Sequence, residues 1–510
     1  MPLETLIELV IFTALALWIA GRLFPGAGHV MAAVTGGVWF LLVKVTAMSW
    51  QGLAWVWSLV VQSSPSGATL MGRWARWRLT KRSHKGLILD GDASRLSIQD
   101  SCRNCAVVAT TGAGKTSSFI LPNLYGLDDC SIVVTDPSGA LYEKASGDLA
   151  ARGFEVLRFD PLNLSHSVRY NPLAYATRHS SAGEIAQVLV ATGLPGAASD
   201  PFWNSGAEEI LTVLIRCLLA GDPAHRNLAN LHMLLQCFGD GRPLFDYVSQ
   251  HADNATFQQF QGFISQAPNT MQGLLSSAKV ALKAVADPDI AALTATNTLD
   301  FGQFRKRKTA LFLVLPQNRL SYYSFLASLL YSQFFHYALD DHQFGRDSLP
   351  MYALLDEFGH LRLPNFPEII TTTRARRISI SIVLQALSQL EERYGKAAAN
   401  TILHGGIASK IFFSGMDTPT AEMLARTVGS RRVEVRDSDN RLHVTQEPLL
   451  SAAELRTLPD NQALYLFANK PATLLSMHPY YDQWALRKRS ELPSYSPPVN
   501  PVAAPTFLQL

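Results

Sequence analysis

Residues 109–116 read Ala-Thr-Thr-Gly-Ala-Gly-Lys-Thr. The apolar run Ala106–Val108 precedes them and favours a β-strand, and Ser117–Leu121 can begin a helix. A strand, a glycine-rich loop and a helix in this order are typical of a phosphate-binding loop. The glycines let backbone N–H groups turn toward a polyphosphate, and the helix N-terminus adds its positive dipole end. The usual pattern has glycine at the first position, where this chain has the small Ala109. We expect the chain to bind a nucleoside triphosphate.

Two side chains of the loop have expected roles. Lys115 can reach the β- and γ-phosphates, and the hydroxyl of Thr116 can hold Mg²⁺. The expected ligands are ATP and Mg²⁺. The residues expected to bind the nucleotide are Thr111, Gly112, Ala113, Gly114, Lys115, Thr116 and Ser117.

A pair of acidic residues completes the expected site. Met351–Leu355 is an apolar, strand-forming run that ends in Asp356 and Glu357. Such a pair is common by itself, but together with the upstream loop it indicates an NTPase. We expect Asp356 to hold Mg²⁺ with Thr116, and Glu357 to polarise the attacking water as a general base.

Further candidates follow these acids. Gln385 ends the β-rich run Ile378–Leu384, where its amide can contact the γ-phosphate or the attacking water, or else serve as a buried structural amide. Arg374 is a candidate arginine finger for the nucleotide of a neighbouring subunit. Arg376 and Arg377 compete for that role, and a simple salt bridge is the alternative. The expected catalytic residues are Glu357, Lys115, Gln385 and Arg374.

Strand-forming runs alternate with helical stretches through much of the chain. The runs lie at 106–108, 131–135, 155–159, 309–315, 351–355, 378–384, 410–413 and 463–467. This alternation predicts an α/β fold with a parallel sheet, whose functional loops follow the carboxyl ends of its strands. Asp136 and Asp160 lie at two such ends, either as functional groups or as turn-forming and helix-capping residues.

Strands are scarce between Thr177 and Asp300. Apolar residues recur there at helical spacing, which predicts an all-α insertion. We expect residues 71–176 and 301–490 to form the two parts of a nucleotide-binding domain, and residues 177–300 to form the insertion. The Pro- and Ser-rich residues 491–510 are expected to be a disordered tail.

The first 70 residues have the composition of a membrane anchor. Residues 6–23 are almost wholly apolar and long enough to cross a bilayer, and a second apolar region covers 30–62. We expect two transmembrane helices in residues 1–70, although the second region also fits a shorter helix followed by an interfacial segment. Basic residues come directly afterwards, at Arg73, Arg76, Arg78, Lys81, Arg82 and Lys85. By the positive-inside rule they place the rest of the chain in the cytoplasm.

Taken together, these motifs resemble the type IV secretion coupling proteins, the TraG/TraD/TrwB group of conjugative ATPases. The likeness covers nearly the whole chain and includes Val134–Gly139, Pro201–Trp203, Leu355–Phe358, Gln385 and Tyr480-Tyr481. It implies a RecA-like P-loop NTPase domain that is interrupted by a helical domain and assembles as a homo-hexamer with nucleotide between subunits. It also implies a location at the bacterial inner membrane, where ATP hydrolysis drives transport.

No motif in the sequence identifies the cargo. The net charge is only +3, so any nucleic-acid surface has to be local. The resemblance implies as partners single- or double-stranded DNA, relaxase or effector proteins, and components of the secretion channel. A DNA translocase of the FtsK type is one alternative, although the helical insertion disfavours it. A nucleotide-gated substrate receptor with little turnover is the other.

Overall fold

The computed structural model describes residues 67–194, 201–239, 242–340, 345, 347–436, 442–502 and 504–510. The expected membrane spans at 6–23 and 30–62 lie outside these ranges. Within these ranges, no helix is long and apolar enough to span a membrane.

A nine-stranded sheet is the centre of the larger of two compact units, which comprises Ala68–Ser430 and Gln446–Leu510. The strand order is β11-β10-β7-β1-β6-β5-β2-β4-β3. The seven strands from β7 to β3 are parallel, β10 is antiparallel to β7, and β11 is antiparallel to β10. The predicted α/β class and parallel sheet are confirmed, and β11 is an addition. The strands are β1 Cys105–Val108, β2 Ser131–Asp136, β3 Glu155–Phe159, β4 Thr309–Val314, β5 Met351–Leu355, β6 Ile378–Leu384, β7 Ser409–Phe413, β10 Gln462–Phe467 and β11 Thr473–Ser476.

The sheet is covered on both faces, which explains why its strands are continuous apolar runs. Every residue of β1, β2, β4, β5 and β6 is buried. Successive side chains point to opposite faces. In β2, for example, Val133 joins a core with α14 (Leu320–Asp340), whereas Val134 joins a second core with α5 (Leu121–Gly126) and α6 (Ala140–Ala151).

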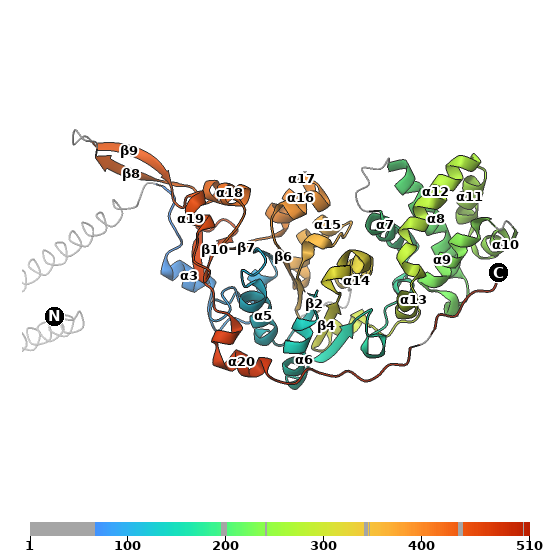
Figure 1. Ribbon diagram of the computed structural model, residues 1–510, viewed down its shortest axis with the longest axis horizontal. Coiled ribbons are helices and arrows are strands. Elements are labelled where there is room, and N and C mark those ends of the chain that lie inside the picture. The colour runs from blue at the N-terminus through green and yellow to red at the C-terminus, as the bar shows by residue number, and fades with distance from the viewer. Residues whose placement is uncertain are drawn as a thin grey trace, which may run out of the picture. The chain divides into compact units, whose positions relative to one another are not determined.

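Between β3 and β4, every element that the structure describes is helical (Figure 1). We refer to α7–α13 as the helical region. Trp203 packs there against Gly273, where an added Cβ would lie 2.3 Å from the indole ring. The helices are α7 Ser181–Gly193, α8 Pro201–Ala220, α9 Leu228–Gln236, α10 Arg242–His251, α11 Asn254–Ile264, α12 Pro268–Ala281 and α13 Pro288–Leu293.

The second compact unit comprises Met1–Gly67 and Arg431–Thr445. Its described part contains most of β8 (Ser430–Arg436) and β9 (Leu442–Pro448), which form a two-stranded sheet. These two strands were not predictable from local patterns, because they contain several charged and polar residues and no continuous apolar run.

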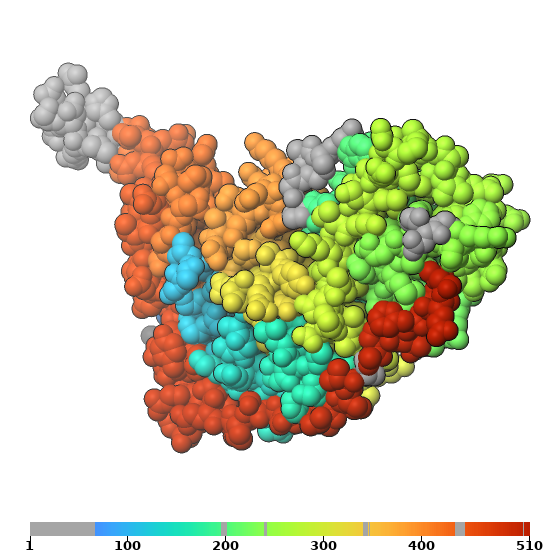
Figure 2. Space-filling view, turned by 45° about the vertical axis from the view of Figure 1, so that its right-hand side comes forward, coloured from blue at the N-terminus to red at the C-terminus, as the bar shows by residue number. Residues whose placement is uncertain are grey.

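The sequence predicts disorder for residues 491–510, here called the tail, whereas the structure describes a path for all of them except residue 503. After α20 (Trp484–Ser490), the tail runs in extended form along the larger unit to the helical region (Figures 1 and 2). Backbone groups of the tail bond to side chains and backbone of that unit, for example Tyr495 to Ser146 and Leu508 to Asn230. The five prolines of the tail disfavour a helix or a sheet strand within it, and its hydrogen-bond partners come from elsewhere in the fold.

Candidate nucleotide site

The loop at 109–115 has the backbone form that phosphate binding requires. Gly112 and Gly114 have φ of 84° and 87°, a region that glycine enters without strain. Ala109 has no positive φ and donates its N–H to the carbonyl of Leu384 at 3.0 Å, so alanine replaces glycine there without strain. A single turn of π-helix, Thr116–Ile120, follows and continues into α5.

Four functional side chains meet at the end of the loop. The Nζ of Lys115 lies 2.6 Å from Oε1 of Glu357 and 3.8 Å from Oδ1 of Asp356. The Nε2 of Gln385 donates to the other carboxylate oxygen of Glu357 at 2.9 Å. Lys115, Asp356 and Glu357 are all buried. The sequence-predicted lysine, acids and glutamine are thus brought together, and Gln385 bonds directly to the expected general base.

Sheet topology explains why these residues meet. They follow β1, β5 and β6, and β6 lies between β1 and β5 in the sheet. Because these strands are parallel, their carboxyl ends lie at the same edge. Residues separated by 270 positions therefore converge on one point.

The backbone of Glu357 is held in a rare conformation. Its φ of 54° and ψ of 39° place it in the left-handed region, which costs a non-glycine residue about 1 kcal/mol or more. Such conformations persist where the surroundings fix them, often at functional sites. Here the N–H of Glu357 also donates to Oδ1 of Asp356 at 3.0 Å.

Burial and charge together set the protonation of Asp356. Burial raises the pKa of this carboxyl group to about 6, Lys115 opposes the rise, and the charges of Glu357 and Asp136 add to it. Among the described residues, no group of three His, Cys, Asp or Glu side chains could hold a metal ion by itself. Mg²⁺ in phosphate-loop enzymes takes most of its ligands from phosphate and water. The protein therefore needs to supply only one or two oxygen ligands, and Thr116 and Asp356 are suitable for this.

The remaining loop residues are exposed or partly exposed. Thr111 and Gly112 are exposed, and Ala113 donates its N–H to the carbonyl of Thr110 at 3.2 Å. The hydroxyl of Ser117 donates to the carbonyl of Gly114 at 3.1 Å, and this hydrogen bond stabilises the end of the loop.

A cavity of about 770 Å³ extends from the loop to segments that the sequence analysis did not identify. Its other walls come from the segment after β7, the approach to β10, and the turn that follows β11. The turn that follows β11 could have been identified from the sequence, because Tyr480-Tyr481 belongs to the motifs that carry the family resemblance. These lining residues include Ser414, Arg456, Asp460, Asn461, His478 and Tyr481.

Arg374 lies far from the loop of its own chain. It belongs to a 3₁₀ turn, Thr373–Arg376, that precedes β6, whereas Gln385 follows the other end of that strand. Seven strand residues separate the two by roughly 20 Å. The Arg374 side chain is exposed and makes no hydrogen bond or ion pair within the described part of the chain. By contrast, Arg377 donates to the carbonyl of Ser348 at 3.1 Å.

The two strand-end aspartates have structural partners. Asp136 accepts hydrogen bonds from the N–H groups of Ser138 and Tyr142, and so caps α6. Asp160 accepts from the N–H of Leu162 and pairs with Arg158. Of the two interpretations left open, the turn-forming and capping one describes these contacts.

Comparison with known proteins identifies relatives over most of the chain. A family model described as Type IV secretory system Conjugative DNA transfer matches residues 75–501. Protein VirD4 of Agrobacterium fabrum (strain C58) is 25% identical over 408 residues, which cover 76% of this chain and 60% of VirD4. The conjugal transfer protein TraG of Rhizobium radiobacter is 25% identical over 397 residues, which cover 72% of this chain and 60% of TraG. The chain thus spans about 60% of the length of these curated relatives.

Solved structures share the fold. An unbound form of the bacterial conjugative coupling protein TrwB has a TM-score of 0.66 at 17% identity, covering 81% of this chain and 93% of that chain. TrwB in complex with ADP and Mg²⁺ has a TM-score of 0.66 at 19% identity, covering 83% of this chain and 95% of that chain. At such identities the likeness concerns the fold alone.

Proposed function

Because this chain belongs to the family of type IV secretory system conjugative DNA transfer proteins, we propose that it is a coupling ATPase that receives DNA or protein cargo and uses ATP hydrolysis to drive the cargo into a secretion channel. The family membership confirms the resemblance predicted from the motifs. The observation that carries the proposal is the meeting of Lys115, Glu357 and Gln385 beside the glycine loop.

In the proposed reaction, the loop N–H groups and Lys115 bind the phosphates of ATP. Thr116 and Asp356 would hold Mg²⁺, which would supply positive charge against the phosphates. Glu357 accepts a proton from the attacking water, and Gln385 fixes the orientation of its carboxylate through the 2.9 Å hydrogen bond. The binding of ADP and Mg²⁺ by TrwB supports the nucleotide and the ion.

The position of Arg374 supports action between subunits. An exposed arginine about one strand length from its own loop can reach a nucleotide only on another copy of the chain. We therefore propose a homo-oligomer, taken as a hexamer from the family resemblance, in which Arg374 stabilises transition-state charge on its neighbour's nucleotide.

The first described helix supports attachment to a membrane. In α3 (Arg73–Leu79), Trp74 and Trp77 are 67% and 58% exposed, with Arg78 and Lys81 over their rings. Exposed tryptophan beside basic residues is typical of the headgroup layer of an anionic membrane. No acidic residue occurs between Glu8 and Asp90. We propose that residues 1–70 anchor the chain in the bacterial inner membrane, with the larger unit in the cytoplasm.

The proposal is tested by ATP turnover of the full chain in lipid, with and without single-stranded and double-stranded DNA, beside Lys115→Ala. Turnover that rises with DNA and vanishes in the variant would support a DNA motor. Turnover that vanishes in the variant but ignores DNA would favour a protein cargo. Nucleotide binding without turnover under every condition would contradict the ATPase and favour the receptor alternative.

A further inference from the structure

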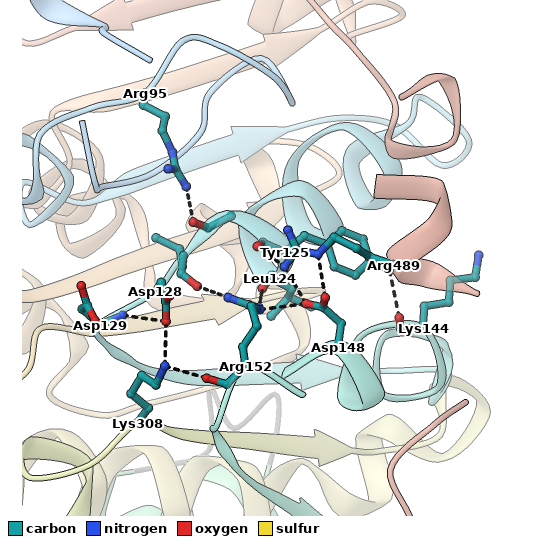
Figure 3. Close-up of polar contacts among 12 residues, drawn as sticks. Arg95, Leu124, Tyr125, Asp128, Asp129, Lys144, Asp148, Arg152, Lys308 and Arg489 are labelled. Carbon is teal, nitrogen blue, oxygen red and sulfur yellow. Dashed lines mark hydrogen bonds and ion pairs between the residues drawn. The ribbon is translucent and has the colours of Figure 1, made fainter. Parts of the chain in front are cut away.

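The helix that precedes the tail, α20, is attached to α6. From α20, Arg489 donates to both carboxylate oxygens of the buried Asp148, at 2.6 and 2.7 Å, and to the carbonyl of Tyr125 at 2.7 Å (Figure 3). Arg152 donates to the same carboxylate at 2.9 Å. Asp148 is thus a buried carboxylate that is paired with two arginines. Removal of one arginine would leave this charge poorly compensated, so Asp148 attaches α20 strongly to α6.

The sequence of α6 accommodates the tail backbone. A Cβ added at Gly147 would lie 2.0 Å from the carbonyl oxygen of Pro493, so only glycine permits this approach. One residue earlier, the hydroxyl of Ser146 accepts the N–H of Tyr495 at 2.9 Å, and the hydroxyl of Tyr142 donates to the carbonyl of Tyr495 at 2.7 Å. Both backbone groups of Tyr495 are therefore satisfied by α6.

The middle of the tail continues along the loop after β3. The N–H of Asn500 donates to the carbonyl of Ser165 at 2.8 Å, and a ring nitrogen of His166 lies 3.2 Å from the carbonyl of Pro497. The tail thus contacts the rest of the larger unit at several points along its length. Its prolines reduce the conformational entropy that is lost when the tail becomes ordered.

At the far end, α9 of the helical region holds the tail by its backbone. The side-chain amide of Asn230 donates to the carbonyl of Thr506 at 2.9 Å and accepts the N–H of Leu508 at 3.0 Å. Asn230 is fully buried, and Leu508 packs against the main core. Because the amide contacts the carbonyl of one residue and the N–H two residues later, it recognises an extended chain rather than a particular side chain.

We propose that the surface of α9 around Asn230 is a docking site for an extended peptide with an apolar residue, and that residues 505–508 of the same chain occupy it. The tail then ties the helical region to α6. That helix begins at Ala140, and the N–H of Tyr142 in its first turn donates to Asp136 at the end of β2, the strand beside β5 that leads to Asp356. The docking itself is independent of the proposed ATPase activity and is tested without it.

The far end is tested by amide hydrogen exchange of the full chain in detergent. In the unmodified chain, the amides of Tyr495, Asn500 and Leu508 should be protected, because each donates to the body. Leu508→Asp puts a charge against the core and should raise exchange at Leu508 and in α9 about tenfold, while Tyr495 stays protected. The matched control is Phe507→Asp, because Phe507 is 56% exposed and should leave the pattern unchanged. An unprotected Leu508 amide, or equal effects of the two variants, would overturn the proposal.

The near end is tested by Gly147→Ala. Alanine favours a helix over glycine, so α6 itself should not be weakened, but the added Cβ should expel Pro493 and expose the Tyr495 amide to exchange. Gly183→Ala in α7 is the control, since its Cβ would meet nothing closer than 3.9 Å. Continued protection of Tyr495 in Gly147→Ala would contradict the path described.

A third experiment tests the site as a peptide receptor and asks which chain supplies the peptide. A synthetic peptide of residues 501–510, added to Leu508→Asp, should restore protection in α9, whereas the same peptide with aspartate at position 508 should not. Cross-linking of the tail to α9 in a mixture of isotopically light and heavy unmodified chains should give only links within one isotope. If the peptide does not restore protection in α9, or if cross-links join light and heavy chains, the proposed contact within one chain is overturned.

Discussion

Lys115 donates a hydrogen bond to Glu357, with 2.6 Å between the ammonium nitrogen and the carboxylate oxygen. This contact joins the glycine loop after β1 to the end of β5. It also supplies the positive charge for a buried site that contains Asp356 and Glu357. A phosphate that binds Lys115 competes with Glu357 for this ammonium group. Nucleotide binding therefore weakens the ion pair that holds the general base.

This relationship gives a stability prediction. Lys115→Ala should lower the free energy of unfolding by about 3 kcal/mol or more, because it leaves two buried carboxylates without their cation. The double variant Lys115→Ala/Glu357→Gln should recover part of that loss. Denaturant unfolding without nucleotide measures both, and a double variant no more stable than the single one would contradict the proposed charge balance.

The protonation of Asp356 gives a pH prediction. Its pKa is raised to about 6 in the fold, chiefly by burial, from an ordinary value of 3.8. The ionised carboxylate therefore destabilises the fold fully above pH 6, and this cost falls as the pH drops toward 4, because the folded state then binds the extra proton. Asp356→Asn should raise the free energy of unfolding at pH 8 by about 3 kcal/mol and by much less near pH 4.5.

The measurement is denaturant unfolding of both chains in EDTA at the two pH values. Asp129→Asn is the control, because Asp129 is exposed and forms its ion pair with Lys85 at the surface. Equal stabilisation by Asp356→Asn at both pH values would show that burial of its charge is not the cause.

Gln389 gives a prediction about positioning. Its side-chain oxygen accepts the backbone N–H of Gln385 at 2.9 Å, and Gln385 in turn bonds Glu357. Gln389→Ala should lower kcat roughly five- to tenfold with little change in KM, since one hydrogen bond contributes about 1 kcal/mol. Gln389→Glu keeps the acceptor oxygen and should restore most of the rate. Steady-state kinetics checks this, and a change in KM alone would contradict it.

Arg374 gives a prediction about the assembly. Arg374→Ala should retain nucleotide binding but lose about a thousandfold in kcat, as expected for an arginine finger. Mixing Arg374→Ala with Lys115→Ala subunits should restore part of the turnover, because one variant supplies an intact loop and the other an intact finger. Arg426→Ala, an exposed arginine on α18 (Thr418–Val428), should change nothing. Inactive mixtures would contradict action between subunits.

Local patterns predicted eight of the nine strands of the large sheet and the candidate residues that meet at the glycine loop. Each continuous apolar run became a strand because the sheet is covered on both faces, and the loop, Asp356, Glu357 and Gln385 converge because their strands are parallel neighbours. The left-handed backbone of Glu357 and its contact with Lys115 have no local signature, since both depend on packing between strands far apart in sequence.

The order of the tail was not predictable for a related reason. Its composition predicts disorder, and the groups that hold it, such as Ser146 and Asn230, lie hundreds of residues earlier. The cavity walls at Arg456 and Asp460 were missed because no motif marks them. The position of Arg374 at the far edge of the sheet was likewise visible only in the fold.

The most direct test of the central claim compares Glu357→Gln with the unmodified chain, using binding of a fluorescent ATP analogue and release of phosphate. Glutamine keeps the shape and the contact with Gln385 but cannot accept a proton from water. We expect the variant to bind nucleotide with unchanged or tighter affinity and to lose turnover by about a hundredfold or more. Turnover close to that of the unmodified chain would contradict the assignment of Glu357 as the general base of an ATP-hydrolysing motor.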